Sequence, residues 1–122
     1  MKTNYQTQIE RIVNALSKSW SIKSSSKWSI ENPAKGHCGV TTLVVNDLLG
    51  GEILKTSLPD GWHFYNFIDG NRYDFTSSQF IEPIAYLDIP SNREEAYLDT
   101  NEKQYTFLKQ RVLMNLDALK SV

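Results

Sequence analysis

The sequence predicts an α+β domain in which helices pack on one antiparallel sheet. Apolar residues recur at helical spacing near both ends of the chain, and a largely apolar segment of helical length lies between them. Short strand-like segments joined by turn residues follow that segment. With 122 residues the chain is long enough for one core and too short for two, so residues 1–122 are expected to form a single domain.

The first predicted element is an amphipathic helix, because its apolar residues lie three, four, seven and eleven positions apart. These residues are Ile9, Ile12, Val13, Leu16 and Trp20. The Ser- and Lys-rich segment 21–35 contains Asn32-Pro33 and one large anchor, Trp28, so it is predicted to be an ordered loop. It leads directly to the single Cys of the chain.

A buried central helix is predicted from Cys38 to Leu49. Its apolar residues cover most of the circumference, and Gly50-Gly51 supplies a C-terminal stop. The β-branched content would also fit a strand, but the length and the glycine stop favour a helix.

Three strands are predicted next, over Glu52 to Leu58, Trp62 to Ile68 and Arg72 to Phe75. Turn residues separate them at Pro59-Asp60-Gly61 and at Asp69-Gly70. We therefore expect an antiparallel sheet of three or more strands.

The last third of the chain begins with an irregular segment, 81–99, in which one short strand is expected around Ala85-Tyr86-Leu87. A long C-terminal helix follows, with Asp99 and Glu102 as a possible capping pair. Its apolar residues at helical spacing are Tyr105, Leu108, Val112, Leu116 and Leu119.

Composition excludes some partners. Basic residues number 13 and acidic residues 14, so no basic field that attracts nucleic acid or an anionic membrane is expected. A lone Cys cannot form an internal disulfide, residues 1–6 lack the apolar stretch of a secretion signal, and no segment approaches the roughly 20 apolar residues of a membrane span. We expect a cytoplasmic protein without nucleic-acid or membrane partners.

Cys38 is the candidate nucleophile. A thiol at the start of a helix lies near unpaired backbone N–H groups and the positive end of the helix dipole, which favour the thiolate. Gly36 and Gly39 flank it, so a substrate carbonyl could approach the backbone closely and use the Cys38 amide as an oxyanion donor. The competing interpretation is a buried, inert Cys.

His63 and Asp74 are the candidate base and its orienting group. If Asp69-Gly70 are the two central residues of the turn, His63 lies opposite Thr76, and Asp74 is its diagonal neighbour on the same face, within reach of a hydrogen bond. Such a carboxylate would fix the imidazole tautomer that accepts a proton from the thiol. The alternatives are a structural core His, a strand-edge Asp, and Asp69 as the orienting carboxylate.

Several further residues are candidates for the site. The amide of Asn32, six residues before Cys38, could be a second oxyanion donor, although Asn-Pro is also a common turn. His37 points in a different direction from Cys38 because successive helical residues do, so it is not expected to be the base and is expected at the surface or at the edge of the pocket. The substrate-binding candidates are Trp28, Gly36, His37, Trp62 and Tyr65.

No cofactor or metal is expected. His37, Cys38, His63 and Asp74 are all competent zinc ligands, but the paired short spacings of structural zinc sites are missing. Glycine-rich phosphate loops and H-E-x-x-H are also missing.

One resemblance supports a thiol site. Gly36-His37-Cys38, then His63, then Asp74-Phe75-Thr76 resembles the papain-like and transglutaminase-like cysteine enzyme superfamily over the middle third of the chain. That resemblance implies a Cys nucleophile, a His base and an Asp orienting group, and Asn32 matches the offset of the oxyanion Gln of papain relatives. The chain is shorter than those domains, with 25 residues from Cys38 to His63 and 11 from there to Asp74.

A closer resemblance runs nearly end to end. The segments Asn32 to Thr41, Gly61 to Asn66 and Asp74 to Phe80 are similar to those of the small bacterial YunG-type family. This resemblance implies a bacterial cytoplasmic origin and a compact fold, and it implies no particular activity.

Three functions follow as hypotheses. The first is thiol-dependent acyl transfer on a peptide, protein or small acyl substrate, by hydrolysis, deamidation or transfer to an amine, with Cys38, His63 and Asp74 as the catalytic residues. The second is a non-catalytic domain that binds a peptide or small ligand through aromatic residues. The third and weakest is a zinc-dependent hydrolase that uses His37, Cys38 and His63.

Overall fold

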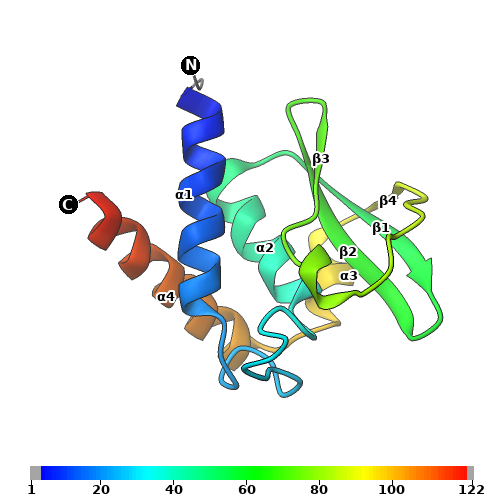
Figure 1. Cartoon of the computed structure of the whole chain (residues 1–122). Helices are drawn as coiled ribbons and strands as arrows, with labels where there is room; N and C mark the ends of the chain where they lie inside the picture. The colour runs from blue at the N-terminus through cyan, green and yellow to red at the C-terminus, as the bar shows by residue number, and fades with distance from the viewer. Residues whose placement is uncertain (1–3, 121–122) are drawn as a thin grey trace.

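The computed structural model describes residues 4–120, and it has the α+β architecture that the sequence predicts (Figure 1). One helix precedes the central helix, a run of strands follows, and a long helix closes the chain. In chain order the elements are α1 (Asn4–Ser19), α2 (Cys38–Leu49), β1 (Glu52–Leu58), β2 (Gly61–Ile68), β3 (Asn71–Tyr73), the short 3-10 helix η1 (Ser77–Gln79), β4 (Ile89–Ser91), α3 (Arg93–Tyr97) and α4 (Glu102–Lys120).

The sheet has the strand order β3-β2-β1-β4, and all neighbours are antiparallel. Helix α2 packs on one face of β2, and α1 and α4 lie against each other on the side of α2 that is turned away from the sheet (Figure 1). Residues 74–88 cover the opposite face of the sheet, where Thr56 bonds the backbone of Ala85 and Leu87. The sheet therefore lies between a helical layer and a covering loop.

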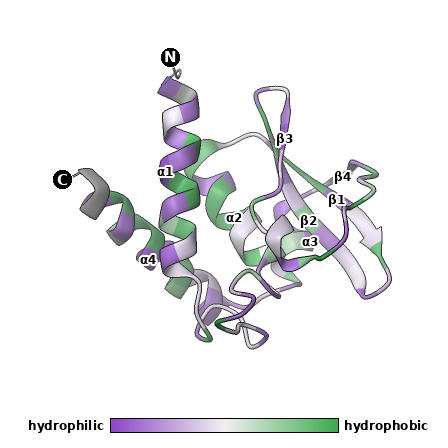
Figure 2. Cartoon of the chain, viewed as in Figure 1, coloured by the Kyte–Doolittle hydropathy of each residue, from purple (hydrophilic) through white to green (hydrophobic). Residues whose placement is uncertain are grey.

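The main core lies between α1, α2 and α4. Ile12 and Leu16 of α1 are buried in it as predicted, whereas Val13 is 48% exposed, so its expected place on the buried stripe was wrong. Ala15 and Ser19 take the inner positions instead. Figure 2 shows hydrophobic residues on α1, α2 and α4, interrupted along α1 by hydrophilic ones.

The central helix is buried from Cys38 through Val45, which confirms the predicted central helix. Gly50, with a φ of 72°, ends it by donating its N–H to the Asn46 carbonyl. A left-handed residue at this position lets the chain leave the helix.

The β2–β3 hairpin has the predicted register. Asp69 and Gly70 both have positive φ, as a two-residue hairpin turn requires, and Ile68 pairs with Asn71. Strand β3 ends at Tyr73, two residues before the predicted end.

The segment after the hairpin differs from expectation. The short strand is β4 at Ile89–Ser91, not around residues 85–87, and helix α3 follows where an irregular segment was expected. Asn92 caps α3 by accepting from the Glu95 N–H, which is the local signal for that helix.

Asn101, not Asp99, caps the long C-terminal helix. Its side chain accepts from the Gln104 N–H, and Asp99 is turned toward α2. The predicted capping pair was therefore wrong. The side chain of Leu119 lies outside the described part of the chain. Within residues 4–120, no helix has the length and apolar character of a membrane span.

Candidate functional site

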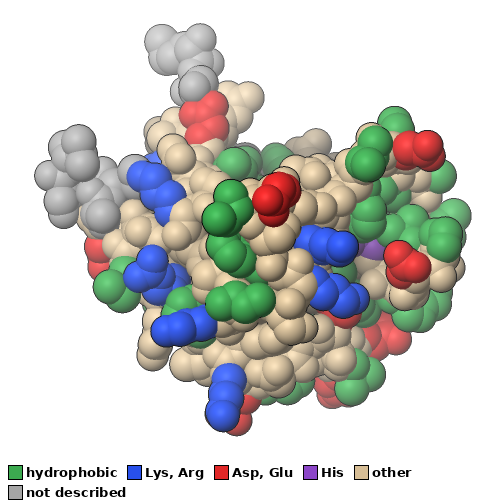
Figure 3. All heavy atoms as spheres, turned by 60° about the horizontal axis from the view of Figure 1, so that its bottom comes forward, with side chains coloured by type: hydrophobic (Ala, Val, Ile, Leu, Met, Phe, Trp, Pro, Cys, Tyr) green, Lys and Arg blue, Asp and Glu red, His purple; other side chains and the backbone are tan. Residues whose placement is uncertain are grey.

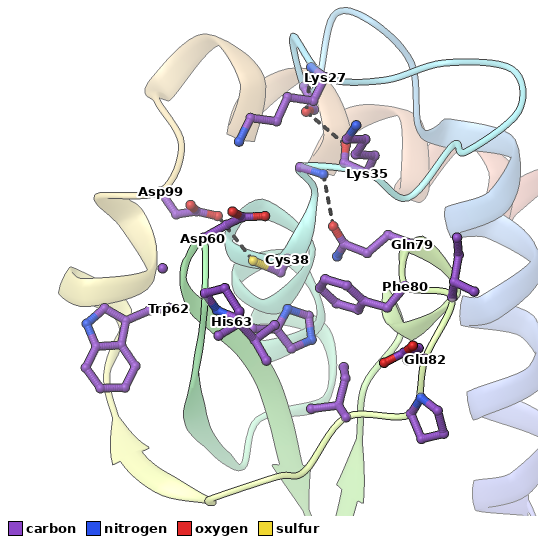
Figure 4. Close-up of a pocket in the computed structure, with 18 of the residues that line it drawn as sticks. Lys27, Lys35, Cys38, Asp60, Trp62, His63, Gln79, Phe80, Glu82 and Asp99 are labelled. Atoms are coloured by element: carbon purple, nitrogen blue, oxygen red, sulfur yellow. Dashed lines mark hydrogen bonds between the residues drawn. The ribbon is translucent and has the colours of Figure 1, made fainter.

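A cavity of about 760 Å³ lies where the N-terminus of α2, the start of β2 and the segment after β3 meet. Cys38, His63, Gln79, Phe80 and Asp99 all line it (Figure 4). Figure 3 shows hydrophobic side chains gathered on the sheet side of the molecule, with Lys and Arg side chains mainly on the helical side. The apolar residues of the cavity wall are Leu58, Pro59, Trp62, Phe80, Ile81, Pro83, Ile84 and Ala85.

The Cys38 thiol is 8% exposed and donates a hydrogen bond to Asp99 Oδ2, at 3.3 Å. The same carboxylate oxygen accepts from the Gly39 N–H at 3.0 Å, so Asp99 binds an unpaired amide at the start of α2. Burial raises the pKa of the Cys38 thiol to about 12, and the negative charge of Asp99 adds to that increase. The expected low thiol pKa is therefore wrong for this conformation: burial and Asp99 outweigh the helix start.

Burial likewise raises the pKa of the Asp99 carboxyl. The hydrogen bonds from Cys38 and Gly39 act in the opposite direction because they stabilise the carboxylate. Asp99 thus competes with any base in the cavity for the thiol hydrogen.

His63 and Asp74 are brought together as the hairpin register requires. His63 Nε2 lies 2.6 Å from Asp74 Oδ2, and His63 is 2% exposed. Tyr86 donates its hydroxyl to the same oxygen, and Thr76 donates its N–H and its hydroxyl to Asp74 Oδ1. Four hydrogen bonds from three residues fix the carboxylate, and the carboxylate holds the imidazole in one orientation.

His63 Nδ1 is buried and has no hydrogen-bond partner among the described residues. Because Asp74 accepts the proton on Nε2, the lone pair of the neutral ring lies on Nδ1. The edge of Phe80 packs on the ring, with centroids 4.9 Å apart. The ring is thus held in one orientation, with Nδ1 unpaired among the described residues, and His63 lines the cavity that also contains the thiol.

Cys38 and His63 reach this cavity from opposite faces of the sheet. Phe64 packs with Cys38 on the α2 face, and His63, one residue earlier, lies on the other face. Strand β3 pairs with β2 only as far as Asn66, so the edge of β2 is open at Phe64. Hydrogen bonding from the Phe64 backbone lowers the pKa of the Cys38 thiol, against the larger effect of burial. Because β3 ends before this point, the backbone of Phe64 interacts with the thiol in place of a strand.

Asn32 does not line the cavity, although it was the predicted second oxyanion donor. Its side-chain amide donates to the Gln79 main-chain carbonyl at 3.0 Å. That hydrogen bond ties the loop before α2 to η1, so the amide of Asn32 supports the site instead of facing it.

His37 is a buried structural residue, not part of the pocket edge. Its Nε2 lies 2.7 Å from Ser24 Oγ, and its Nδ1 lies 3.2 Å from the Lys35 carbonyl. Burial lowers the pKa of His37 to about 4. The side chain points away from Cys38 into the loop of residues 21–35, as adjacent positions at a helix start do.

Of the other predicted substrate contacts, Gly36 and Trp62 line the cavity, while Trp28 and Tyr65 do not. Tyr65 is 1% exposed and donates its hydroxyl to Asp88. Trp28 has its indole nitrogen buried without a partner in the described part of the chain.

Two polar residues of the site were not predicted from the sequence, Asp99 and Gln79. Asp99 is 61 positions from Cys38, and its spacing to Glu102 indicated a different role, in a capping pair of the C-terminal helix. Gln79 lies in η1, five positions after Asp74, and nothing in its local sequence distinguishes it from a surface Gln.

Across residues 4–120, no three His, Cys, Asp or Glu side chains are arranged to hold a metal ion. The zinc alternative required His37, Cys38 and His63 together, and His37 faces the loop. These residues do not fit a zinc site.

Comparison with known proteins gives one consistent family. The family model described as YunG protein matches residues 8–117. The "Uncharacterized protein YunG" of Bacillus subtilis (strain 168) is 51% identical over 111 residues, which cover 91% of this chain and 96% of that protein. No solved structure matches the chain.

Proposed function

The chain belongs to the YunG family, and we propose that it is a thiol-dependent acyl-transfer enzyme in which Cys38 is the nucleophile, His63 the base and Asp74 the orienting group. One observation carries this proposal: Asp74 binds His63 Nε2 and leaves Nδ1 buried and unpartnered within residues 4–120, and His63 lines the same cavity as the only thiol of the chain. Nucleophilic catalysis needs this order of groups, with a base beside the nucleophile and a third group orienting the base. The order along the chain resembles that of papain-like and transglutaminase-like enzymes.

The reaction begins when the thiol turns from Asp99 and transfers its proton to His63 Nδ1. The thiolate sulfur bonds to the acyl carbon of an amide, ester or thioester, and the electron pair of the C=O π bond moves to the oxygen. When that pair returns, the leaving amine, alcohol or thiol departs with the proton of His63. Water or an amine then attacks the acyl–Cys38 thioester, His63 takes its proton, and the thiol is restored.

The lining of the cavity suits an acyl substrate that is a peptide, a protein or a small molecule. Trp62 is 48% exposed and Ile81 is fully exposed, and both line the cavity. Apolar surface beside a buried nucleophile suits the apolar part of a substrate. A reducing compartment such as the cytoplasm would keep the lone thiol free.

A second candidate function is a non-catalytic peptide or small-ligand binding domain. The raised pKa of the Cys38 thiol, about 12, favours it, because a thiol that is protonated at neutral pH is a poor nucleophile. In the enzyme, the thiol has to leave Asp99 before it reacts.

Alkylation of Cys38 by iodoacetamide as a function of pH separates the two functions. For the enzyme we expect alkylation of the folded protein, and a lower rate constant in His63→Ala because the base that takes the thiol proton is lost. An acyl thioester or p-nitrophenyl acetate should then form an acyl–Cys38 adduct that intact-protein mass spectrometry detects. Cys38→Ala is the control for both reactions.

A thiol that reacts only in denaturant, with no adduct from either acyl donor, would overturn the enzyme and leave the binding domain. If the adduct forms equally fast in His63→Ala, Cys38 is a nucleophile but His63 is not its base.

A further inference from the structure

The cavity is also lined by Gln79, which carries a donor that is unpartnered among the described residues, whereas the unpartnered His63 Nδ1 is an acceptor. Its side-chain Nε2 is buried and has no hydrogen-bond partner among residues 4–120. A buried amide donor without a partner destabilises the fold, and such groups are rare in folded proteins. A donor in the wall of a cavity is satisfied when an acceptor enters that cavity.

The amide of Gln79 is held in one orientation. Its Oε1 accepts the Gly36 N–H at 3.2 Å, and only the oxygen of an amide can accept, so Nε2 must be the end that points away from Gly36. Figure 4 shows this nitrogen directed into the cavity on the side where Cys38 lies. The Asn32 amide holds the Gln79 main chain from behind.

The position of Gly36 is equally fixed. Its φ is +74°, and a Cβ there would come within 2.4 Å of Ser25 Oγ and 3.0 Å of Lys27 Cβ. Gly36 also lies two residues before Cys38, so its N–H ties the Gln79 amide to the chain that leads into the nucleophile. The donor is therefore preorganised relative to Cys38 without contacting it.

We propose that Gln79 Nε2 and the Cys38 backbone N–H form the oxyanion hole of this site, with Asn32 as a positioning residue. The inference rests on the proposed acyl transfer and adds a catalytic residue to it. As the Cys38 sulfur bonds to the acyl carbon, the carbonyl π pair moves to the oxygen, and the two N–H groups donate to that oxyanion. When the pair returns and the leaving group departs, both donors are released unchanged.

The ratio of two rate constants tests this role. Acylation of Cys38 by p-nitrophenyl acetate passes through an oxyanion, whereas alkylation by iodoacetamide does not, so their ratio cancels any change in the thiolate itself. We expect Gln79→Met, which keeps the length of the side chain but has no donor, to lower the ratio about 100-fold. Gln79→Glu, which retains an acceptor for Gly36, should lower it as well if Gln79→Met does not fold.

Gln104→Met is the matched control, because Gln104 lines the same cavity and its side chain accepts from Thr100 instead of facing the site unpaired. Its ratio should equal that of the wild type. A ratio unchanged in both Gln79 variants would overturn the oxyanion role and leave the acyl transfer intact. Alkylation without acylation in the wild type would overturn the acyl transfer, and the oxyanion role with it.

Discussion

The Cys38 thiol donates its hydrogen bond to Asp99, 3.3 Å away, and not to His63, which lines the same cavity and whose Nδ1 has no partner in the part of the chain that the structure describes. The proposed nucleophile and the proposed base thus line one cavity, and the thiol is hydrogen-bonded to a third residue. Asp99 also binds the N–H of Gly39, so its carboxylate is kept at the start of α2 whether or not the thiol stays bound. The proposed mechanism therefore requires the thiol to leave Asp99 for His63.

Replacing Asp99 with Asn should make Cys38 more reactive. The substitution removes the negative charge that raises the thiol pKa and retains an oxygen for the Gly39 N–H. We expect the pKa of Cys38 to fall by about one unit or more, and alkylation below that pKa to become about tenfold faster. The measurement is the rate of iodoacetamide alkylation against pH. Asp60→Asn is the control: it changes another carboxylate of the cavity wall and should leave the dependence of the alkylation rate on pH unchanged. If that dependence is also unchanged in Asp99→Asn, Asp99 does not raise the thiol pKa.

Loss of the Asp74 carboxylate should destabilise the fold more than loss of any one donor to it. Asp74→Ala leaves His63, Thr76 and Tyr86 without their acceptor, so we expect the free energy of unfolding to fall by about 3 kcal/mol. Tyr86→Phe removes one donor and should cost about 1 kcal/mol. Urea unfolding measures both. Equal costs for the two variants would show that the cluster does not depend on its carboxylate.

His37 should make the protein less stable in mild acid. Its pKa is about 4 in the folded state against 6.5 for an ordinary His. Between these values the unfolded chain binds more protons than the folded one, so stability falls as pH falls from about 6.5 to about 4, by about 3 kcal/mol in all. In His37→Gln this contribution disappears. Urea unfolding of both proteins over the same pH range gives the difference, and a difference that does not vary with pH would contradict the prediction.

Gly39→Ala should be destabilising although alanine favours helices. A Cβ at this position would lie 2.6 Å from Asp99 Cβ and 2.7 Å from the Ala96 carbonyl oxygen, so the segment after α3 would have to move. We expect a loss of about 2 kcal/mol, typical of an overpacked core, together with faster alkylation of Cys38 as Asp99 is displaced. Asn14→Ala on the exposed face of α1 should be close to neutral in thermal unfolding. If Gly39→Ala does not change the stability, Asp99 and Ala96 move aside for the new Cβ at little cost.

The sequence predicts the central helix and the hairpin well because both are determined locally. Asp69-Gly70 sets the register of β2 and β3, and that register places Asp74 beside His63. Val13 shows the limit of this reasoning: its spacing fits the apolar stripe, but the buried face is decided by where α4 packs, and Ala15 and Ser19 lie there instead.

Asp99 and Gln79 could not be predicted because their roles depend on long-range packing. Asp99 has the local pattern of a helix cap, yet the chain turns it to the start of a helix 60 residues earlier. Gln79 has no local pattern at all, and only the passage of η1 beside Gly36 gives its amide a fixed direction. Conversely, Asn32 lies six residues before Cys38, an offset that suits an oxyanion donor. Its amide instead donates to the Gln79 main-chain carbonyl and ties the loop before α2 to η1.

The two halves of the site differ in how far apart their partners lie along the chain. His63 and Asp74 are 11 positions apart in one hairpin, whereas Cys38 and Asp99 are 61 positions apart. Contacts between near residues close small loops and form early in folding, and distant contacts form later. The His63–Asp74 pair is therefore formed by the hairpin and the residue that follows it. The Cys38 thiol gains Asp99 as its partner only when the segment after α3 packs against the start of α2. Because the chain is synthesised from its N-terminus, Cys38 is made 61 residues before Asp99, and the newly made thiol has no Asp99 to bind until that later segment exists.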